Sequence, residues 1–141
     1  MATILVVDDD RAFRELVVDI LAPEGHRLLQ ASSAEEALRR LAEIPAELVL
    51  TDQRMPGADG IELVRRVQRL RSPPRVVVMT AFGTIPQAVE AVRLGADDYL
   101  TKPLEIPAAL RQLVRRVLGE HDRPAAEGDE LGERGATDIA A

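Results

Sequence analysis

The sequence predicts an α/β domain in which a five-stranded parallel sheet is covered by helices on both faces. Short apolar runs alternate five times along the chain with segments of helical period. The central runs are continuously apolar rather than alternating, which is typical of parallel strands buried on both faces. Crossovers between parallel strands are right-handed, so helices are expected on each side of the sheet.

The first unit pairs an apolar run at 3–7 (TILVV) with a helical segment at 11–22. Asp10 stands where an N-cap residue is expected. Pro23 and Gly25 are expected to end the helix. The residues expected on its buried face are Phe13, Leu16, Val17, Ile20 and Leu21.

The second and third strands are expected at 26–31 (HRLLQA) and 47–51 (ELVLT). Between them, Ser33 and Glu36 have the spacing of a capping box, which predicts a helix that runs through Leu41. This segment completes the second βα unit.

The third helix is expected to begin after Asp59, which forms a similar cap with Glu62, and to end near Leu70. The run at 75–80 (RVVVMT) is the expected fourth strand. Both segments continue the alternation of strand and helix.

The fourth helix is expected to start at Thr84 and Gln87 and to end at Gly95. Its expected buried residues are Ile85, Ala88, Val89 and Val92. The fifth strand is expected at 98–101 (DYLT), followed by a helix that ends at Gly119. The apolar stripe of this last helix is Leu110, Leu113, Val114 and Val117.

Composition and charge exclude several classes of function. The chain of 141 residues has no cysteine, which excludes disulfides, thiol catalysis and Cys-ligated zinc and fits a cytoplasmic protein. No apolar run approaches the ~20 residues of a membrane span. The net charge is −6, and the segment from Gly119 to Ala141 has seven acidic and two basic residues. Because the rest has no basic excess, direct binding of nucleic acid is not expected. We assign 1–119 to the domain and 120–141 to a disordered acidic tail or a truncated linker.

Polar residues close four of the five expected strands. Asp8 and Asp9 follow the first strand, Asp52 the third, Thr80 ends the fourth and Lys102 follows the fifth. The carboxyl ends of parallel strands lie at one edge of the sheet, which is where ligands bind in such folds. Each residue alone has a structural explanation, as a cap, a β-former or a surface lysine. Together they predict one shared site.

The acidic residues of this site predict a bound cation. Asp8, Asp9 and Asp52 would bring like charges within several ångströms, and each pair would cost on the order of 1–4 kcal/mol. A divalent cation relieves that repulsion. A set of oxygen ligands without His or Cys suits Mg²⁺.

The motifs VVDDD at 6–10, TDQRMPGADG at 51–60, MTA at 79–81 and GADDYLTKP at 95–103 resemble the receiver domain of two-component response regulators. The resemblance spans roughly residues 3 to 118. It implies a flavodoxin-like fold with strand order 2-1-3-4-5. That order would place Asp8 and Asp9 beside Asp52, with Thr80 and Lys102 next to them.

The resemblance further implies that Asp52 accepts a phosphoryl group from a phosphohistidine of a sensor histidine kinase. The protein is then a signalling phosphoacceptor rather than an enzyme. Mg²⁺ would be held by Asp9 and Asp52 directly, by Asp8 through water, and by the backbone carbonyl of Arg54.

Other residues at the strand ends receive roles from the same resemblance. Lys102 would pair with one phosphoryl oxygen, and Thr80 would donate its hydroxyl to another. Ala81 would leave room for entry of the phosphoryl group. Pro103 matches a proline that usually follows the lysine through a cis bond, which would aim Lys102 inward.

The expected output is a shift between two conformations. Thr80 would move toward the phosphoryl group, and Tyr99 would turn inward to fill the vacated space; the alternative is that Tyr99 is an amphipathic residue of an edge strand. Arg54 and Phe82 would flank the phosphoryl group and tune its lifetime. The readout surface would combine the fourth helix, the fifth strand and the fifth helix. Its charged candidates are Arg93, Asp97, Asp98, Arg111 and Arg115.

Other functions remain open at this stage. A Mg²⁺-dependent phosphatase with an aspartate nucleophile would share Asp52, but it would need a second aspartate where Arg54 stands. A receiver fold that acts without phosphorylation is a second alternative, although all the acids and the lysine are present. Flavin binding lacks a hydroxyl-rich phosphate loop and the aromatic residues to hold the ring.

The segment from Thr80 to Pro103 looks like receivers attached to transcription activators of the nitrogen-regulation class. The receiver could pass its signal to an attached output domain, to a partner protein or to a second copy of the chain in a homodimer formed on phosphorylation. Alternatively, the chain could be a stand-alone receiver that passes phosphate on in a relay.

Overall fold

The computed structural model describes residues 1–81, 85–102 and 107–122, and for Ala81 and residues 120–122 it describes the backbone alone. The strands are β1 (Thr3–Val7), β2 (Arg27–Ala31), β3 (Leu48–Asp52), β4 (Arg75–Ala81) and β5 (Asp98–Lys102). The helices are α1 (Arg11–Leu21), the short 3₁₀ helix η1 (Ala22–Glu24), α2 (Ala34–Glu43), α3 (Gly60–Val67), α4 (Ile85–Arg93) and α5 (Pro107–Asp122).

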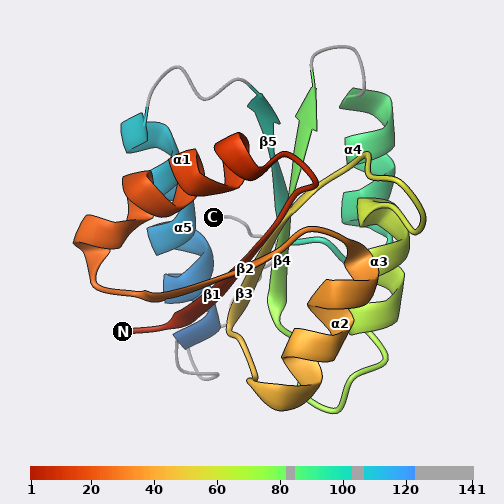
Figure 1. Ribbon diagram of the computed structural model, residues 1–141, viewed down its shortest axis with the longest axis horizontal. Helices are drawn as coiled ribbons and strands as arrows, with labels where there is room; N and C mark the ends of the chain where they lie inside the picture. Colours follow the sequence, from red (N-terminus) through yellow and green to blue (C-terminus); the bar gives the residue numbers. More distant parts are fainter. Residues whose placement is uncertain (82–84, 103–106, 123–141) are drawn as a thin grey trace.

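The five strands form one parallel sheet in the order β2-β1-β3-β4-β5. This is the flavodoxin-like order that the sequence predicts, and the prediction is confirmed. Figure 1 shows the sheet as the middle of three layers, with α1 and α5 against one face and α2, α3 and α4 against the other. The reversal between β1 and β3 creates the crevice in which ligands of such sheets bind.

Alternate residues of the central strands supply the two halves of the core. Leu5 and Val49 point to the side of α2, α3 and α4, whereas Val6 and Leu50 point to the side of α1 and α5. All four are fully or almost fully buried. Two-sided burial explains why these strands read as continuous apolar runs in the sequence.

Three side-chain caps begin helices where the sequence predicts them. Asp10 accepts hydrogen bonds from the amides of Ala12 and Phe13 at the start of α1. Ser33 caps α2 and Asp59 caps α3, each through the amide three residues later. These caps fix the first turn of each helix.

Several helix ends differ from the expected positions. α2 continues to Glu43 and α3 ends at Val67, before Leu70. α5 continues through Gly119 to Asp122, so the first three residues assigned to a tail belong to this helix. Residues 123–141, the rest of the expected tail, lie outside the described residues, and the division at residue 119 stays a prediction.

The buried face of α4 is not the one that the sequence predicts. Ala88 and Ala91 are fully buried, whereas Val89 and Val92 are 46% and 38% exposed. The small side chains let the helix lie close to the sheet, and the larger valines face outward. The prediction that Val89 and Val92 are core residues is therefore wrong. The expected burial of Leu16 on α1 is also wrong, because this residue is 44% exposed.

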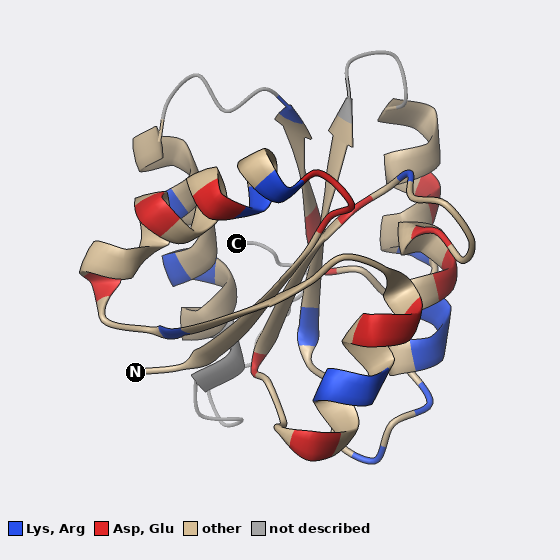
Figure 2. Cartoon of the chain, viewed as in Figure 1, with Lys and Arg blue, Asp and Glu red and all other residues tan. Residues whose placement is uncertain are grey.

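The strand register brings the carboxyl ends of four strands to one edge of the sheet. Val7 is paired with Thr51, and Asp52 with Met79. Ala81 is paired with Lys102. Figure 2 shows the acidic turn between β1 and α1 at this same edge. None of the helices in the described ranges combines the length and apolar character that a membrane-crossing segment requires.

Candidate functional site

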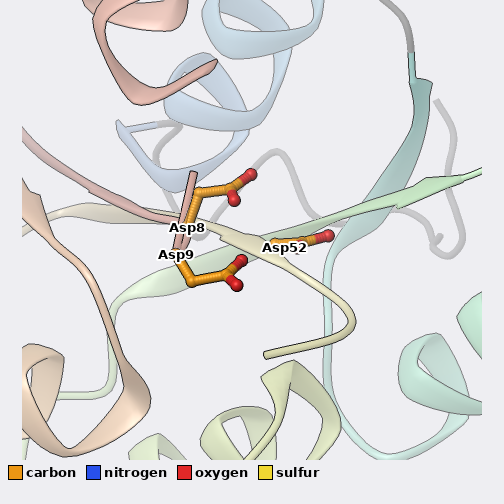
Figure 3. Close-up of side chains that lie close together, drawn as sticks. All are labelled: Asp8, Asp9 and Asp52. Atoms are coloured by element: carbon orange, nitrogen blue, oxygen red, sulfur yellow. The ribbon is translucent and has the colours of Figure 1, made fainter. Parts of the chain in front are cut away.

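Three aspartates from two neighbouring strands converge at the carboxyl edge of the sheet. Asp8, Asp9 and Asp52 each offer a carboxylate oxygen, and these oxygens all lie within 4.8 Å of one another. Figure 3 shows Asp8 and Asp9 after β1 with their side chains directed to the side of Asp52. Asp8 is fully buried and Asp52 is 8% exposed, whereas Asp9 is exposed. Two carboxylates of the cluster are therefore buried, and the third is open to solvent.

Backbone contacts hold Asp8 in this position. Its amide donates to the carbonyl of Ala31 at 3.1 Å, which continues the pairing of β1 with β2. Its carbonyl accepts from Arg14 Nη1 at 2.8 Å, and its carboxylate Oδ1 accepts from the amide of Asp10 at 2.9 Å. The turn after β1 is thus held by a residue of α1, by the N-cap residue of that helix and by the end of β2.

Lys102 supplies a positive charge to the two buried carboxylates. Its Nζ lies 3.1 Å from Asp8 Oδ2 and 3.6 Å from Asp52 Oδ1. The ammonium group also lies 4.2 Å from the centroid of the Phe13 ring, within the range of a cation–π contact. Lys102 is the single lysine among 18 basic residues of the chain.

Burial raises the pKa of both enclosed carboxyl groups. For Asp8, loss of solvation raises the pKa, and the Asp10 amide and Lys102 partly offset it. For Asp52, loss of solvation and the charge of Asp8 raise the pKa, and Lys102 together with nearby backbone amides lowers it in part. One cation therefore does not fully compensate this cluster, and a further positive charge would be stabilised in it.

Thr80 is tied to a residue that the sequence analysis did not single out. The Thr80 hydroxyl donates to Gln53 Oε1 at 2.5 Å, and Gln53 Nε2 donates to Gln87 Oε1 on α4 at 2.7 Å. Thr80 is fully buried and Gln53 is 3% exposed. No local pattern in the sequence indicates this chain of side chains, because its three members come from β4, the end of β3 and α4.

Gly60 is a second residue of the site that sequence reasoning missed, although it lies within the quoted motif. A Cβ atom at Gly60 would lie 2.1 Å from the backbone oxygen of Asp52. The Gly60 amide donates to the carbonyl of Gln53 at 2.9 Å. The first residue of α3 therefore packs directly on the backbone that carries Asp52, and only glycine leaves room for this approach.

The remaining predicted site residues are spread around this cluster. Tyr99 on β5 is half-buried and packs against the core on the side of α2, α3 and α4. The Arg54 side chain is exposed, and its backbone amide is among the groups that lower the pKa of Asp52. Ala81 is the last residue of β4. Phe82 and Pro103, with the expected cis bond, lie outside the described residues.

Most of the charged residues expected on the readout surface have partners within the fold. Asp97 pairs with Arg75 at 3.0 Å and accepts from the amide of Val76 at 2.8 Å. Arg115 forms two hydrogen bonds with Glu24 of η1, at 2.7 and 2.9 Å. Asp98 pairs with Arg116, and Arg93 with Glu90. For Asp97 and Arg115, these contacts supply a structural role.

A groove lies beside the site, between the loop after β3 and the helices α3 and α4. Its volume is about 890 Å³. The lining residues include Gln53, Arg54 and Gln87. Gln53 thus lines the groove and also contacts Thr80.

Comparison with known proteins identifies the family of the chain. Residues 4–115 match the family model described as the response regulator receiver domain. The chain belongs to the response regulator receiver family. Receiver domains are signalling phosphoacceptors of two-component systems, and they bind Mg²⁺ through acidic residues.

Relatives of this receiver domain include two longer regulators. The response regulator protein FleR of Pseudomonas aeruginosa is 43% identical over 128 residues, which cover 91% of this chain and 27% of FleR. The DNA-binding transcriptional regulator NtrC of Azospirillum brasilense is 38% identical over 132 residues, which cover 94% of this chain and 27% of NtrC. The chain thus spans about a quarter of the length of both relatives. Their similarity confirms the expected likeness to nitrogen-regulation activators.

A solved structure supports the fold of the receiver domain. The crystal structure of NtrX from Brucella abortus superimposes with a TM-score of 0.80 at 35% sequence identity. The match covers 84% of this chain and 27% of that chain. The parallel sheet therefore belongs to a fold that is known from experiment.

Proposed function

We propose that Asp52 of this receiver domain accepts a phosphoryl group from the phosphohistidine of a sensor histidine kinase. The observation that carries the proposal is the meeting of Asp8, Asp9, Asp52 and Lys102 at one edge of the sheet, with carboxylate oxygens within 4.8 Å and the ammonium group 3.6 Å from Asp52. Packing of the core does not require four charged side chains at this edge of the sheet. A site for a dianionic group and a cation does require them.

The transfer would use Asp52 as the nucleophile. A carboxylate oxygen of Asp52 forms a bond to phosphorus while the bond between phosphorus and the histidine nitrogen breaks, and the electron pair stays on the imidazole. The product is an acyl phosphate. Because the transition state of such transfers is loose, the protein mainly positions groups and balances charge.

Lys102 and Thr80 would stabilise the phosphoryl oxygens. Lys102 already lies between Asp8 and Asp52, so a phosphoryl group on Asp52 would stand within reach of its ammonium group. Thr80 is the last residue but one of the neighbouring strand β4 and carries a donor hydroxyl. Ala81 would leave the entrance open, and Arg54 and Phe82 would affect how readily water reaches the acyl phosphate.

The acidic cluster fits Mg²⁺. Its donors are oxygens only, and its two buried carboxyl groups have raised pKa values that a cation would lower. Asp9 and Asp52 would hold the ion directly, Asp8 through water, and the backbone carbonyl of Arg54 would complete the protein ligands. The bound ion supplies charge neutralisation for the phosphoryl oxygens.

The signal would leave the domain through the surface of α4, β5 and α5. Val89 and Val92 are exposed on α4, and Tyr99 is half-buried on β5 next to it. These side chains supply apolar contact area that the isolated domain does not use. The partner would be an output domain, a separate protein or a second copy of the chain, and transcription would be the process controlled.

Phosphorylation in solution tests this function. The protein is incubated with Mg²⁺ and acetyl phosphate, and its intact mass is measured. One added phosphoryl group is expected in the wild type, and none in Asp52→Asn or without Mg²⁺. A modified Asp52→Asn protein, or no modification of the wild type by acetyl phosphate or by a histidine kinase, would contradict the proposal.

A further inference from the structure

Gln53 is a buried polar residue next to the proposed nucleophile. It directly follows Asp52, and its side chain is 3% exposed. Its backbone is fixed on both sides, since its amide donates to the carbonyl of Met79 at 2.9 Å and its carbonyl accepts from the amide of Gly60 at 2.9 Å. A change at Gln53 must therefore occur in the side chain.

Both ends of the Gln53 amide are occupied by side chains from other elements. The oxygen accepts from the Thr80 hydroxyl at 2.5 Å, and the nitrogen donates to Gln87 Oε1 at 2.7 Å. An apolar side chain of similar volume would fill the same space without a need for partners. The polar group is thus used for its connections rather than for packing.

We propose that Gln53 is a positioning residue, which engages the Thr80 hydroxyl in the unmodified domain and transmits its release to α4 through Gln87. The inference rests on the proposed function, in which Thr80 donates to the phosphoryl group of Asp52. A hydroxyl has one proton to donate. Gln53 Oε1 and a phosphoryl oxygen therefore compete for it.

The competition links the two ends of the amide. When Thr80 turns to the phosphoryl group, Gln53 Oε1 loses a partner in a buried place, which is unfavourable unless the amide rearranges. Rearrangement alters the contact of Nε2 with Gln87, which lies in the first turn of α4. The first turn of α4 then adjusts, and by reciprocity a ligand that favours the adjusted α4 also favours modification of Asp52.

The test uses beryllofluoride with Mg²⁺, a mimic of the phosphoryl group that adds to aspartate carboxylates. Affinity is measured by titration, and the response of α4 is measured from the amide chemical shifts of residues 88–93. Gln53→Met removes the competing acceptor and the link together. We expect its affinity for beryllofluoride to rise about three- to tenfold, the equivalent of one lost hydrogen bond, and the response of α4 to fall by at least half.

A second variant and a control separate the parts of the inference. Gln87→Met keeps the bond between Gln53 and Thr80, so we expect affinity within twofold of the wild type and a reduced response of α4. The control is Gln112→Met, the same change at an exposed glutamine of α5 on the other face of the sheet. It is expected to match the wild type in both measurements.

Three other outcomes would contradict the inference, its link to α4 or the proposed function. Wild-type affinity and a full α4 response in Gln53→Met would overturn the inference, and if that variant does not fold, a full response in Gln87→Met would do so. A higher affinity with an intact response would overturn the link to α4. Absence of beryllofluoride binding in the wild type would overturn the proposed function together with this inference.

Discussion

The ammonium group of Lys102 lies 3.1 Å from the carboxylate of Asp8, a residue with no exposed surface. The same group lies 3.6 Å from Asp52. One cation at the end of β5 thus serves carboxylates from the ends of β1 and β3. This arrangement makes the stability of the unmodified domain depend on a residue that the proposed function assigns to phosphoryl transfer.

Replacement of Lys102 by methionine tests that dependence. Without the ammonium group, Asp8 and Asp52 lie close together with no cation, so we expect a loss of about 1–3 kcal/mol in the free energy of unfolding without Mg²⁺. We also expect phosphorylation by acetyl phosphate to slow by about 100-fold. Urea unfolding and mass spectrometry measure the two effects.

The control for Lys102→Met is Arg11→Met, which removes an exposed pair with Glu15. This surface change should cost less than about 0.5 kcal/mol and leave phosphorylation unchanged. Equal losses of stability in the two variants would show that Lys102 contributes no more to the free energy of unfolding than an exposed ion pair does.

Replacement of Asp52 by asparagine is expected to stabilise the protein in the absence of Mg²⁺. Burial and the charge of Asp8 raise the pKa of Asp52, so its ionised form opposes folding at neutral pH. Removing the charge should increase the free energy of unfolding by about 1 kcal/mol and Tm by about 4 °C. Thermal unfolding of both proteins in chelator measures the difference.

The sign of this effect changes with pH in a defined way. A raised carboxyl pKa contributes stability that is fully present below the unfolded value, about 3.9, and is lost as pH rises through the folded value. The advantage of Asp52→Asn should therefore vanish as pH falls toward 4 and grow toward neutral pH. An advantage that is constant across this range would mean that charge is not its cause.

The affinity for Mg²⁺ should fall as the solution becomes acidic. The ion requires deprotonated carboxylates, and burial raises the pKa of both Asp8 and Asp52 above the ordinary range. We expect Mg²⁺ to raise Tm at pH 7. As the solution is made more acidic, this increment should begin to fall at a higher pH than carboxyl groups of ordinary pKa would give. Asp9→Asn should lose most of the increment at every pH.

Gly60→Ala should disturb the site without changing any of its side chains. The new Cβ would lie 2.1 Å from the backbone oxygen of Asp52, so α3 or the end of β3 must shift. We expect a loss of about 2–3 kcal/mol in stability and a 10- to 100-fold slower phosphorylation, since displacement of a nucleophile by about 1 Å has such effects.

A matched control is available in α5. Gly119 is a helical glycine with nothing within 4 Å of the position of its Cβ, so Gly119→Ala should stabilise the protein by about 0.5–1 kcal/mol. If Gly60→Ala behaved in the same way, the close packing of α3 on Asp52 would be refuted.

The strands and their polar ends could be predicted because burial leaves a direct trace in the sequence. A strand covered on both faces has no polar alternate positions, so Asp8 and Asp52 stand out where the apolar runs stop. The strand order came from the resemblance to receiver domains, since apolar runs alone do not define neighbours. The helix caps at Asp10, Ser33 and Asp59 were predictable because each acts within three residues.

Contacts between distant segments could not be predicted in the same way. The hydrogen bonds that join Gln53 to Thr80 and Gln87 span 27 and 34 residues, and no local pattern encodes them. The approach of Gly60 to Asp52 depends on how the chain returns after the loop. Composition did offer a sequence signal for Lys102. It is the single lysine of a chain whose other Lys and Arg positions are all arginine, which sets it apart from the ordinary surface cations.

The face of α4 was predicted wrongly because hydrophobicity was taken as burial. Val89 and Val92 are the more hydrophobic residues, but Ala88 and Ala91 face the sheet. A helix that lies close to a sheet has room for a methyl group and not for a branched side chain. The two valines are left on the surface, where apolar residues are tolerated singly and adjacent ones are typical of a contact with another molecule.

Substitutions in α4 test this face directly. Val92→Asp should change the free energy of unfolding by less than about 0.5 kcal/mol, as expected for a surface position, whereas Ala91→Leu should cost about 1–3 kcal/mol through overpacking.

Leu16→Asp on α1, where Leu16 is 44% exposed, is the control for an apolar surface residue away from α4. If α4, β5 and α5 form the output surface, sedimentation velocity after treatment with beryllofluoride and Mg²⁺ should show that Val92→Asp weakens any self-association and that Leu16→Asp does not. A large loss of stability in Val92→Asp would show that Val92 belongs to the core. Equal effects of Val92→Asp and Leu16→Asp on self-association would show that α4 is not part of the contact.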